Sequence, residues 1–335
     1  MTALSRRNFL KLSAFASLGL AFDLAQPSPD TFHSLGRVTT EYLRVHLRPS
    51  KKAKQVAWLG FDNIIKIFDS LLGDEGRVWH EVSNGYVESV EVQPVENRLN
   101  PVGVSLPSGG QIGEITVPFT DARRKPEAYA PIIYRLYYGS TFWVRDLMRD
   151  SGGQVWYKLY DERLGIYYYA LAAHLRLVPA NETTPLSPSV TGKRLVVNLQ
   201  QQRLYAYEGS VEVFSTLISA GRLYLAGDGL TTHSWTPPGQ FTMERKRPSR
   251  HMGFGEAAGS DYELPGVPWV SYFHWKGFSF HGTWWHNDFG RPRSAGCINM
   301  LPEDARWLYR WSHPIPLPDQ ELTTGAGTAV EIIDG

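Results

Sequence analysis

The stretch RLVVNLQQQRLYAYEGSVEVFSTLIS, residues 194–219, decides the fold of the C-terminal part of this chain. It holds three runs rich in β-branched and aromatic residues, interrupted at Gln200–Gln202 and at Glu208–Ser210. Short runs of this kind, separated by polar or Gly-containing segments, are typical of antiparallel strands joined by tight turns. The stretch therefore predicts a meander of three strands at the start of a β-rich domain.

Further strands are expected downstream, with one helix among them. The segment PWVSYFHWKGFSFHG (268–282) is strand-like up to His281, and GTAVEII (327–333) predicts a closing strand. PEDARWLYRW (302–311) predicts a helix, because Pro, Glu and Asp suit a first turn, where unpaired N–H groups and the helix dipole favour acidic side chains.

The composition agrees with a mainly β, globular chain. Hydrophobic residues make up 42% of the 335 residues and charged residues 20%, which is enough apolar material to form cores. The 34 Lys and Arg nearly balance the 33 Asp and Glu, so a net charge of +1 gives no electrostatic reason to expect a nucleic-acid partner. Plentiful aromatic residues, 31 Gly and 22 Pro favour short strands joined by turns.

The N-terminus predicts export. SRRNFLKLSAFASLGLAF (5–22) places two arginines before a short apolar run, as in a secretory signal, and the arginine pair resembles the twin-arginine export signal. We expect a signal peptide over residues 1–25 and a location outside the cytoplasm, in the cell envelope. An ordinary basic signal and an uncleaved anchor remain open, as do cleavage after Ala21 or Ala25. No other apolar run is long enough to predict a membrane span.

Two segments resemble each other. IKIFDSLLGDEGRVWHEV (65–82) and FWVRDLMRDSGGQVWYKL (142–159) align on Trp79 and Trp156, with a Gly-containing turn before each Val-Trp pair. The similarity predicts a repeated β-hairpin unit.

The regions around these hairpins resemble bacterial SH3-like domains. LRVHLRPSKKAKQVAWL (43–59) carries this resemblance in the first region and TDARRKPEAYAPIIYRL (120–136), more weakly, in the second. It implies two small β-barrels, at 36–105 and 111–180, that either bind the cell wall or act as spacers. A Pro-, Ser- and Thr-rich linker at 181–193 would then precede the C-terminal domain, 194–335.

Cys297 is the one cysteine of the chain and lies in SAGCINM (294–300). A single cysteine forms no intramolecular disulfide, so in an exported protein it is a reactive thiol, an intermolecular link or a small buried residue. Attack on a carbonyl requires a thiolate, a nearby base such as His281, and N–H donors for the oxyanion. Gly296 would allow the turn that presents such donors.

These residues resemble the catalytic motif of the L,D-transpeptidase family. The match consists of His281-Gly282, a loop, and then Ser294, Gly296, Cys297, Ile298 and Asn299; TPPGQF (236–241) and GTAVEI (327–332) resemble other conserved parts of that domain. The resemblance implies a β-sandwich in which Cys297 is the nucleophile and His281 the general base and acid. Many family members have a histidine where this chain has Ala295.

The resemblance also implies a substrate and a chemistry. Cys297 would attack a peptidoglycan tetrapeptide stem, release D-alanine and pass the acyl group to an amine of a neighbouring stem, giving a 3–3 cross-link. The expected partners are stem peptides, with no cofactor, no metal and a monomeric protein. We expect the turn to comprise Ser294, Ala295 and Gly296, and the substrate site to comprise Gly282, Thr283, Trp284 and Asn299. Weaker candidates are His286 and Asp288 and, as groove-lining or merely packed side chains, Trp269, Phe273 and Trp285.

Alternative readings stay open. Water as the acceptor would make the protein an L,D-carboxypeptidase, and Ala295 leaves room for a non-catalytic wall-binding protein. Papain-like wall amidopeptidases place their cysteine before their histidine, which is the reverse of the order of His281 and Cys297. His233, His251 and His274 show no metal-ligand spacing.

Overall fold

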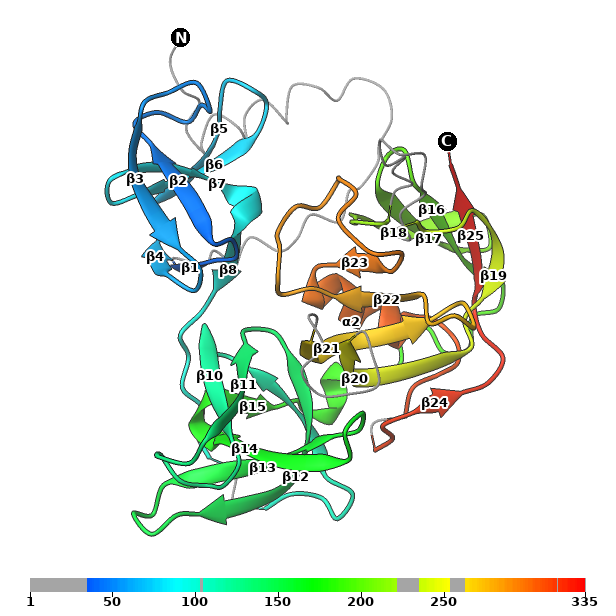
Figure 1. The fold of residues 1–335 in the computed structure, drawn as a ribbon. Coiled ribbons are helices and arrows are strands. Elements are labelled where there is room, and N and C mark those ends of the chain that lie inside the picture. The colour runs from blue at the N-terminus through cyan, green and yellow to red at the C-terminus, as the bar shows by residue number, and fades with distance from the viewer. Residues whose placement is uncertain (1–34, 103–104, 222–234, 254–262, 318, 335) are drawn as a thin grey trace, which may run out of the picture. The chain divides into compact units, whose positions relative to one another are not determined.

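The computed structural model describes residues 35–102, 105–221, 235–253, 263–317 and 319–334 (Figure 1). Strands dominate these residues, so the predicted mainly β fold is confirmed. The expected signal at 1–25 and His233 lie outside the described residues. In the described ranges, no helix has the length and apolar composition needed to cross a membrane.

The chain divides into two compact units. The first unit ends at Asn97 and also takes in Trp285–Asp288, and the second comprises Arg98–Trp284 and Phe289–Gly335.

Two sheets form the first unit, in the orders β4-β1-β8 and β3-β2-β7-β6-β5. Val38, Val87 and Val92 are fully buried in its apolar core. Its elements are β1 (Leu35–Val38), β2 (Tyr42–His46), β3 (Gln55–Gly60), β4 (Ile64–Lys66), β5 (Asp69–Leu72), β6 (Val78–Val82), β7 (Gly85–Glu88), the 3-10 helix η1 (Ser89–Glu91) and β8 (Val92–Val95).

A seven-stranded sheet of order β11-β10-β14-β13-β12-β9-β15 opens the second unit and has its own core around Ile115, Leu159 and Ala170. Its elements are β9 (Gln111–Ile115), β10 (Phe119–Arg123), β11 (Ile132–Tyr137), β12 (Thr141–Arg149), β13 (Val155–Asp161), β14 (Ile166–Leu171), η2 (Ala172–His174) and β15 (Leu175–Leu177); η3 (Ala180–Glu182) follows.

The predicted hairpin repeat is confirmed. Trp79 pairs with Leu71 across the β5–β6 hairpin, and Trp156 pairs with Met148 across β12–β13, which is the same register in the two aligned segments. The turn glycines Gly76 and Gly153 both have positive φ, 68° and 82°. Glycine is the residue that adopts this backbone conformation without strain, so both hairpins use the same turn chemistry.

Two five-stranded sheets form the rest of the second unit, in the orders β18-β17-β16-β25-β19 and β23-β22-β21-β20-β24. Their elements are β16 (Lys193–Asn198), β17 (Arg203–Glu208), β18 (Val211–Leu217), β19 (Gly239–Thr242), β20 (Arg245–Gly253), β21 (Glu263–Tyr272), β22 (Ser279–Gly282), β23 (Ile298–Met300), α2 (Pro302–Trp311), β24 (Thr323–Thr324) and β25 (Ala329–Ile333).

The expected meander, helix and closing strand are therefore present. Residues 268–282 differ from the expectation of one strand-like run, because β21 ends at Tyr272 and β22 begins at Ser279. A turn lies between them, in which the Gly277 N–H donates to the His274 carbonyl at 2.9 Å and Gly277 has a φ of 94°. The apolar residues on both sides of Gly277 suggested one continuous strand, but a glycine within a strand pattern can also mark a turn, as it does here.

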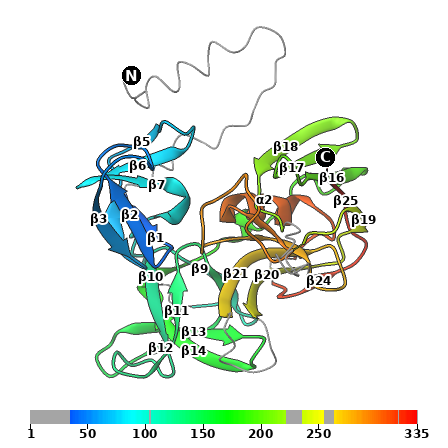
Figure 2. The same cartoon turned by 45° about the horizontal axis from the view of Figure 1, so that its top comes forward.

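Helix α2 lies between the two C-terminal sheets (Figures 1 and 2). On one side Trp307 stacks on Phe214 of β18, with ring centroids 4.1 Å apart, and on the other Tyr309 packs against Trp269 of β21 at 5.4 Å. Side chains from both sheets and from α2 share one apolar core. The C-terminal part is thus two sheets with a helix between them, and its core holds β22 and β23 in place.

Residues 181–193, expected to form a linker, pack on α2. Glu182 accepts from Arg176 and Arg306, and the Leu186 N–H donates to the Arg310 carbonyl at 3.0 Å. Residues 183–192, between η3 and β16, form no helix or strand, and this irregular segment contacts the surface of α2.

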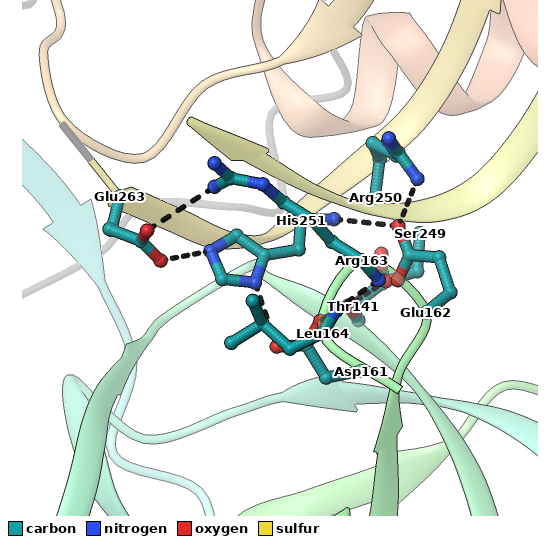
Figure 3. A network of polar contacts seen from close by, with 9 residues as sticks. All are labelled: Thr141, Asp161, Glu162, Arg163, Leu164, Ser249, Arg250, His251 and Glu263. Carbon is teal, nitrogen blue, oxygen red and sulfur yellow. Dashed lines mark hydrogen bonds and ion pairs between the residues drawn. The ribbon is translucent and has the colours of Figure 1, made fainter. Parts of the chain in front are cut away.

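The seven-stranded sheet is joined to β20 and β21 by a polar network (Figure 3). His251 of β20 lies between two carboxylates, with Nδ1 2.7 Å from Asp161 Oδ2 and Nε2 2.6 Å from Glu263 Oε2. Arg250 pairs with Glu162 at 2.9 Å. These contacts link chain segments about a hundred residues apart and fix β20 and β21 from the side of the seven-stranded sheet.

Candidate active site

The expected base lies on β22, and the expected nucleophile immediately precedes the neighbouring parallel strand β23. In the register of β22 and β23, Phe280 pairs with Ile298 and His281 pairs with Asn299. Phe280 and Ile298 are fully buried in the core between the sheets. Because side chains alternate along a strand, His281 and Asn299 project from the opposite face.

Cys297 immediately precedes β23 and projects from that same face. Its Sγ lies 3.7 Å from the hydroxyl of Ser279, and Ser279 is two residues before His281 on β22. The structure thus brings the thiol, the imidazole and the Asn299 side chain to one face of two adjacent strands, across a loop that separates them in the sequence.

His281 is held in one orientation. Its Nδ1 lies 3.0 Å from the Gly282 carbonyl oxygen, and a carbonyl only accepts hydrogen bonds, so Nδ1 carries the proton of the neutral ring. The lone pair then lies on Nε2. Burial lowers the pKa of His281 to about 4, against a smaller opposing effect of the Gly282 contact. At neutral pH the ring is uncharged and able to accept a proton.

The Cys297 thiol is neutral at rest. The residue is partly exposed, and burial of the sulfur raises its pKa, while hydrogen bonds from the Ser279 hydroxyl and the Ser279 N–H oppose that rise. A neutral thiol beside a neutral imidazole is suited to general-base catalysis, in which the proton moves as the sulfur attacks.

The turn before Cys297 requires a glycine. Gly296 has a φ of 121°, and a Cβ there would lie 2.4 Å from Phe278 Cε1 and 3.2 Å from the Trp235 carbonyl oxygen. The Gly296 N–H donates to the Ser294 hydroxyl at 3.0 Å, and that hydroxyl donates to the Cys297 carbonyl. The expected oxyanion donor at Gly296 is thus engaged by Ser294 in this structure.

Thr236 holds this turn in place through two hydrogen bonds, a role that the sequence did not indicate. Its hydroxyl donates to the Gly296 carbonyl at 2.9 Å and accepts from the Gly221 N–H at 2.8 Å, and its side chain is fully buried. A buried Thr that contacts two backbone groups ties β18's continuation to the nucleophile turn. The sequence signal was its place at the start of TPPGQF.

The other expected site residues lie in different surroundings. Gly282 ends β22 and is buried against the first residue of α2, since a Cβ would lie 2.6 Å from Pro268 Cγ and 2.9 Å from Pro302 Cα. The Thr283 N–H extends the strand pairing by donating to the Met300 carbonyl at 3.0 Å. Trp284 is 5% exposed and stacks on Tyr137, with ring centroids 4.4 Å apart.

Several weaker candidates are core or loop residues. Trp269 and Phe273 are each 1% exposed and belong to the core between the sheets, so ordinary packing describes both. Trp285, His286 and Asp288 fall in the segment grouped with the first unit, where the Asp288 N–H donates to His286 Nδ1 at 3.2 Å. Ala295 is exposed and Ser294 is half-buried.

The C-terminal domain is similar in sequence to known L,D-transpeptidases. Residues 192–332 match the YkuD family model, described as the L,D-transpeptidase catalytic domain. A Bacillus subtilis (strain 168) protein named "Putative L,D-transpeptidase YciB" is 29% identical over 123 residues, which cover 34% of this chain and 57% of that protein. The chain thus spans a little over half the length of this curated relative.

Solved structures with the same description are more distant. The catalytic domain of Enterococcus faecium L,D-transpeptidase is 22% identical, with a TM-score of 0.31 over 42% of this chain and 96% of that one. An L,D-transpeptidase from Mycobacterium smegmatis is 16% identical, with a TM-score of 0.32 over 76% of this chain and 90% of that one. Scores this low add no argument of their own. The sequence match to the L,D-transpeptidase catalytic domain model covers residues 192–332, a range that includes His281 and Cys297.

Proposed function

We propose that this protein is an exported peptidoglycan L,D-transpeptidase that forms 3–3 cross-links through a thioester on Cys297. The observation that carries the proposal is the common face of β22 and β23, from which the Cys297 thiol and the His281 imidazole project. The family match over residues 192–332 supports the substrate class, a stem peptide of peptidoglycan.

The proposed reaction follows from the two neutral groups. Nε2 of His281 takes the thiol proton as Sγ attacks the carbonyl carbon that precedes the terminal D-alanine. The imidazolium then gives this proton to the leaving D-alanine amine, and a thioester remains on Cys297. An amine of a neighbouring stem attacks the thioester, loses a proton to His281, and restores the thiol as the cross-link forms.

The Gly282 carbonyl contributes to both proton transfers. It holds Nδ1 as the protonated nitrogen, so Nε2 is the atom that exchanges protons, and it gains a charge-assisted contact when the ring becomes an imidazolium. N–H donors of the nucleophile turn would stabilise the oxyanion. Because the Gly296 N–H is engaged by Ser294, its use requires the Ser294 hydroxyl to turn away when substrate binds.

The remaining parts of the proposal concern location and attachment. We propose that residues 1–25 direct export by the twin-arginine route to the cell envelope. The two hairpin-repeat regions would be SH3-like domains, acting as wall-binding modules or as spacers, and the protein would act as a monomer without cofactor.

Product analysis with purified tetrapeptide muropeptides tests the activity. The wild-type protein should release D-alanine and produce a 3–3 linked dimer, and Cys297→Ala should do neither. If the product is tripeptide without any dimer, the activity is L,D-carboxypeptidation and not transpeptidation. Intact muropeptides, with protein whose folding is verified by circular dichroism, would overturn the enzymatic proposal in favour of wall binding.

Carbapenem acylation provides a second readout that needs no acceptor. The intact mass of the wild-type protein should rise by one carbapenem, and Cys297→Ala should stay unmodified. Ser271→Ala is the matched control, because Ser271 is fully buried on β21 and pairs with Phe280, on the core side of the sheet. This variant should be acylated as the wild type is.

A further inference from the structure

Among the described residues, Ser279 has a side-chain hydroxyl in contact with the sulfur of Cys297. It begins β22, is fully buried and has its hydroxyl oxygen 3.7 Å from Sγ. Nothing in the Cys-His motif pointed to it. Its position two residues before His281 places the hydroxyl and the imidazole on the same face of β22.

The Gly277 carbonyl and the Ser279 hydroxyl, two of the polar groups near the sulfur, differ in what they can do. The Gly277 carbonyl oxygen lies 3.9 Å from Sγ and can only accept a hydrogen bond, so it interacts with the thiol and repels the thiolate. The Ser279 hydroxyl both accepts and donates. It can accept the S–H of the thiol and, by rotating about its C–O bond, donate its own proton to the thiolate.

A donor at this place matters because burial works against ionisation. Burial raises the pKa of Cys297, and the hydroxyl and N–H of Ser279 are the groups that oppose the rise. Hydrogen bonds to ionised groups are stronger than those between neutral ones. The contact therefore strengthens at the moment when the proton moves from Sγ to Nε2 of His281.

We infer that Ser279 is a catalytic residue whose hydroxyl donates a hydrogen bond to the Cys297 thiolate. The inference rests on the proposed function only for the role of Cys297 as nucleophile. The step is a proton transfer: the S–H bond breaks, the proton goes to His281 Nε2, and the Ser279 O–H turns from acceptor to donor without losing its own proton.

The test measures ionisation of the thiol without any wall substrate. Because Cys297 is the one cysteine of the chain, alkylation by iodoacetamide followed by intact mass reports on this sulfur alone. Loss of the donor in Ser279→Ala should move the midpoint of the alkylation rate against pH upward by about one pH unit. At pH 7 the rate should fall roughly 3-fold, since a more basic thiolate is also more nucleophilic.

Two variants separate the hydrogen bond from packing. Ser271→Ala removes an equally buried hydroxyl from the neighbouring strand, on the core side of the sheet, and should leave the midpoint unchanged. Ser279→Thr keeps the hydroxyl and should also leave the alkylation midpoint unchanged. The inference is overturned if the alkylation midpoint of Ser279→Ala equals that of the wild type. It is also overturned if the midpoint of folded Ser279→Thr moves as far as that of Ser279→Ala.

The alkylation experiment can succeed or fail independently of the proposed transpeptidase activity. If the midpoint moves as expected but muropeptides stay intact, the thiolate contact stands and transpeptidation fails. If muropeptides are cross-linked and Ser279→Ala leaves both the midpoint and kcat unchanged, the enzyme stands and the role of Ser279 fails.

Discussion

At the scale of single residues, the candidate site combines two groups that burial keeps uncharged. The pKa of His281 is lowered to about 4 and that of Cys297 is raised, both mainly by burial. Both groups are therefore uncharged at neutral pH, which is the resting state that the proposed general-base mechanism requires.

The lowered pKa of His281 predicts an acid-dependent stability. Its folded pKa lies below the unfolded value of about 6.5, so the unfolded chain binds more protons between these values and stability falls as pH decreases through this window. Between pH 7.5 and 5.0 the wild type should lose about 2 kcal/mol that His281→Gln does not lose. Urea unfolding at both pH values measures this difference.

His80 of the first unit serves as a comparison, because burial lowers its pKa to about 4 as well. It contributes equally to the wild type and to His281→Gln, so the difference between these two proteins isolates His281. Parallel stability curves for the two would show that His281 titrates alike in the folded and unfolded states.

Substitution of Gly296 should both destabilise the protein and move the Cys297 backbone. Gly296→Ala places a Cβ against Phe278 and the Trp235 carbonyl, at a φ of 121° that L-residues rarely adopt. The variant should lose about 1–3 kcal/mol of stability and shift the Cys297 backbone. Gly209→Ala, at a turn glycine with φ of 62° and no heavy atom within 4 Å of the added Cβ, is the control for φ alone.

The measurement is alkylation of Cys297 together with thermal unfolding. Gly296→Ala should alter both the alkylation rate and the melting temperature, whereas Gly209→Ala should alter the melting temperature only slightly and the rate not at all. Equal alkylation rates in the wild type and in Gly296→Ala would mean that the turn adapts to the side chain.

At the scale of elements, α2 depends on two lysines from strands. Lys246 of β20 is fully buried and donates to the carbonyls of Tyr309 and Ser312, and Lys193 of β16 donates to the Trp311 carbonyl at 2.7 Å. Carbonyls at a helix C-terminus lack partners within the helix, and cations there interact favourably with the dipole. Burial and the neighbouring Lys193 hold the pKa of Lys246 well below its usual value.

Lys246→Met should therefore destabilise the protein. The substitution keeps the apolar stem but leaves two buried carbonyls without their donor, which we expect to cost about 2 kcal/mol, partly offset by the removal of a buried charge. Lys276→Met removes an exposed lysine and should change stability by less than about 0.5 kcal/mol. Equal urea midpoints for the two variants would contradict a capping role of Lys246.

At the scale of the whole molecule, the polar network at His251 joins two parts of the second unit. Asp161 is fully buried and also accepts from the N–H groups of Arg163 and Leu164, each at 3.1 Å. Tyr134 packs edge-on to the His251 ring, and burial together with Asp161 and Glu263 raises the pKa of Tyr134 to about 12.

Loss of His251 should be costly for this reason. His251→Leu leaves the carboxylates of Asp161 and Glu263 facing each other without the ring between them, and breaking a buried charged contact costs about 3–5 kcal/mol. Arg135→Gln, which removes an ion pair with Asp121 at 3.4 Å where the arginine side chain is 41% exposed, should cost less than about 1 kcal/mol. Chemical unfolding of both variants is the measurement, and equal losses would contradict a structural role of the network.

Local sequence patterns predicted the elements that depend on local physics. The meander from Arg194, the bounds of α2 at Pro302–Trp311 and the paired hairpins around Trp79 and Trp156 all follow from period-two alternation, turn glycines and first-turn residues. The motif also pointed to Cys297 and His281, since nucleophilic chemistry restricts the residue types that can serve.

The sequence by itself determined the β-rich architecture and the C-terminal helix, and it indicated the two candidate catalytic side chains, because alternation, turns and chemistry are encoded within short segments. Only the tertiary structure decided that Ser279 contacts the thiol, that Thr236 holds Gly296, and that His251 and Lys246 find partners far along the chain. These contacts depend on parallel pairing and on packing between distant segments. Such pairings are set by the shared core and by the pairing of buried polar groups, which no single segment specifies.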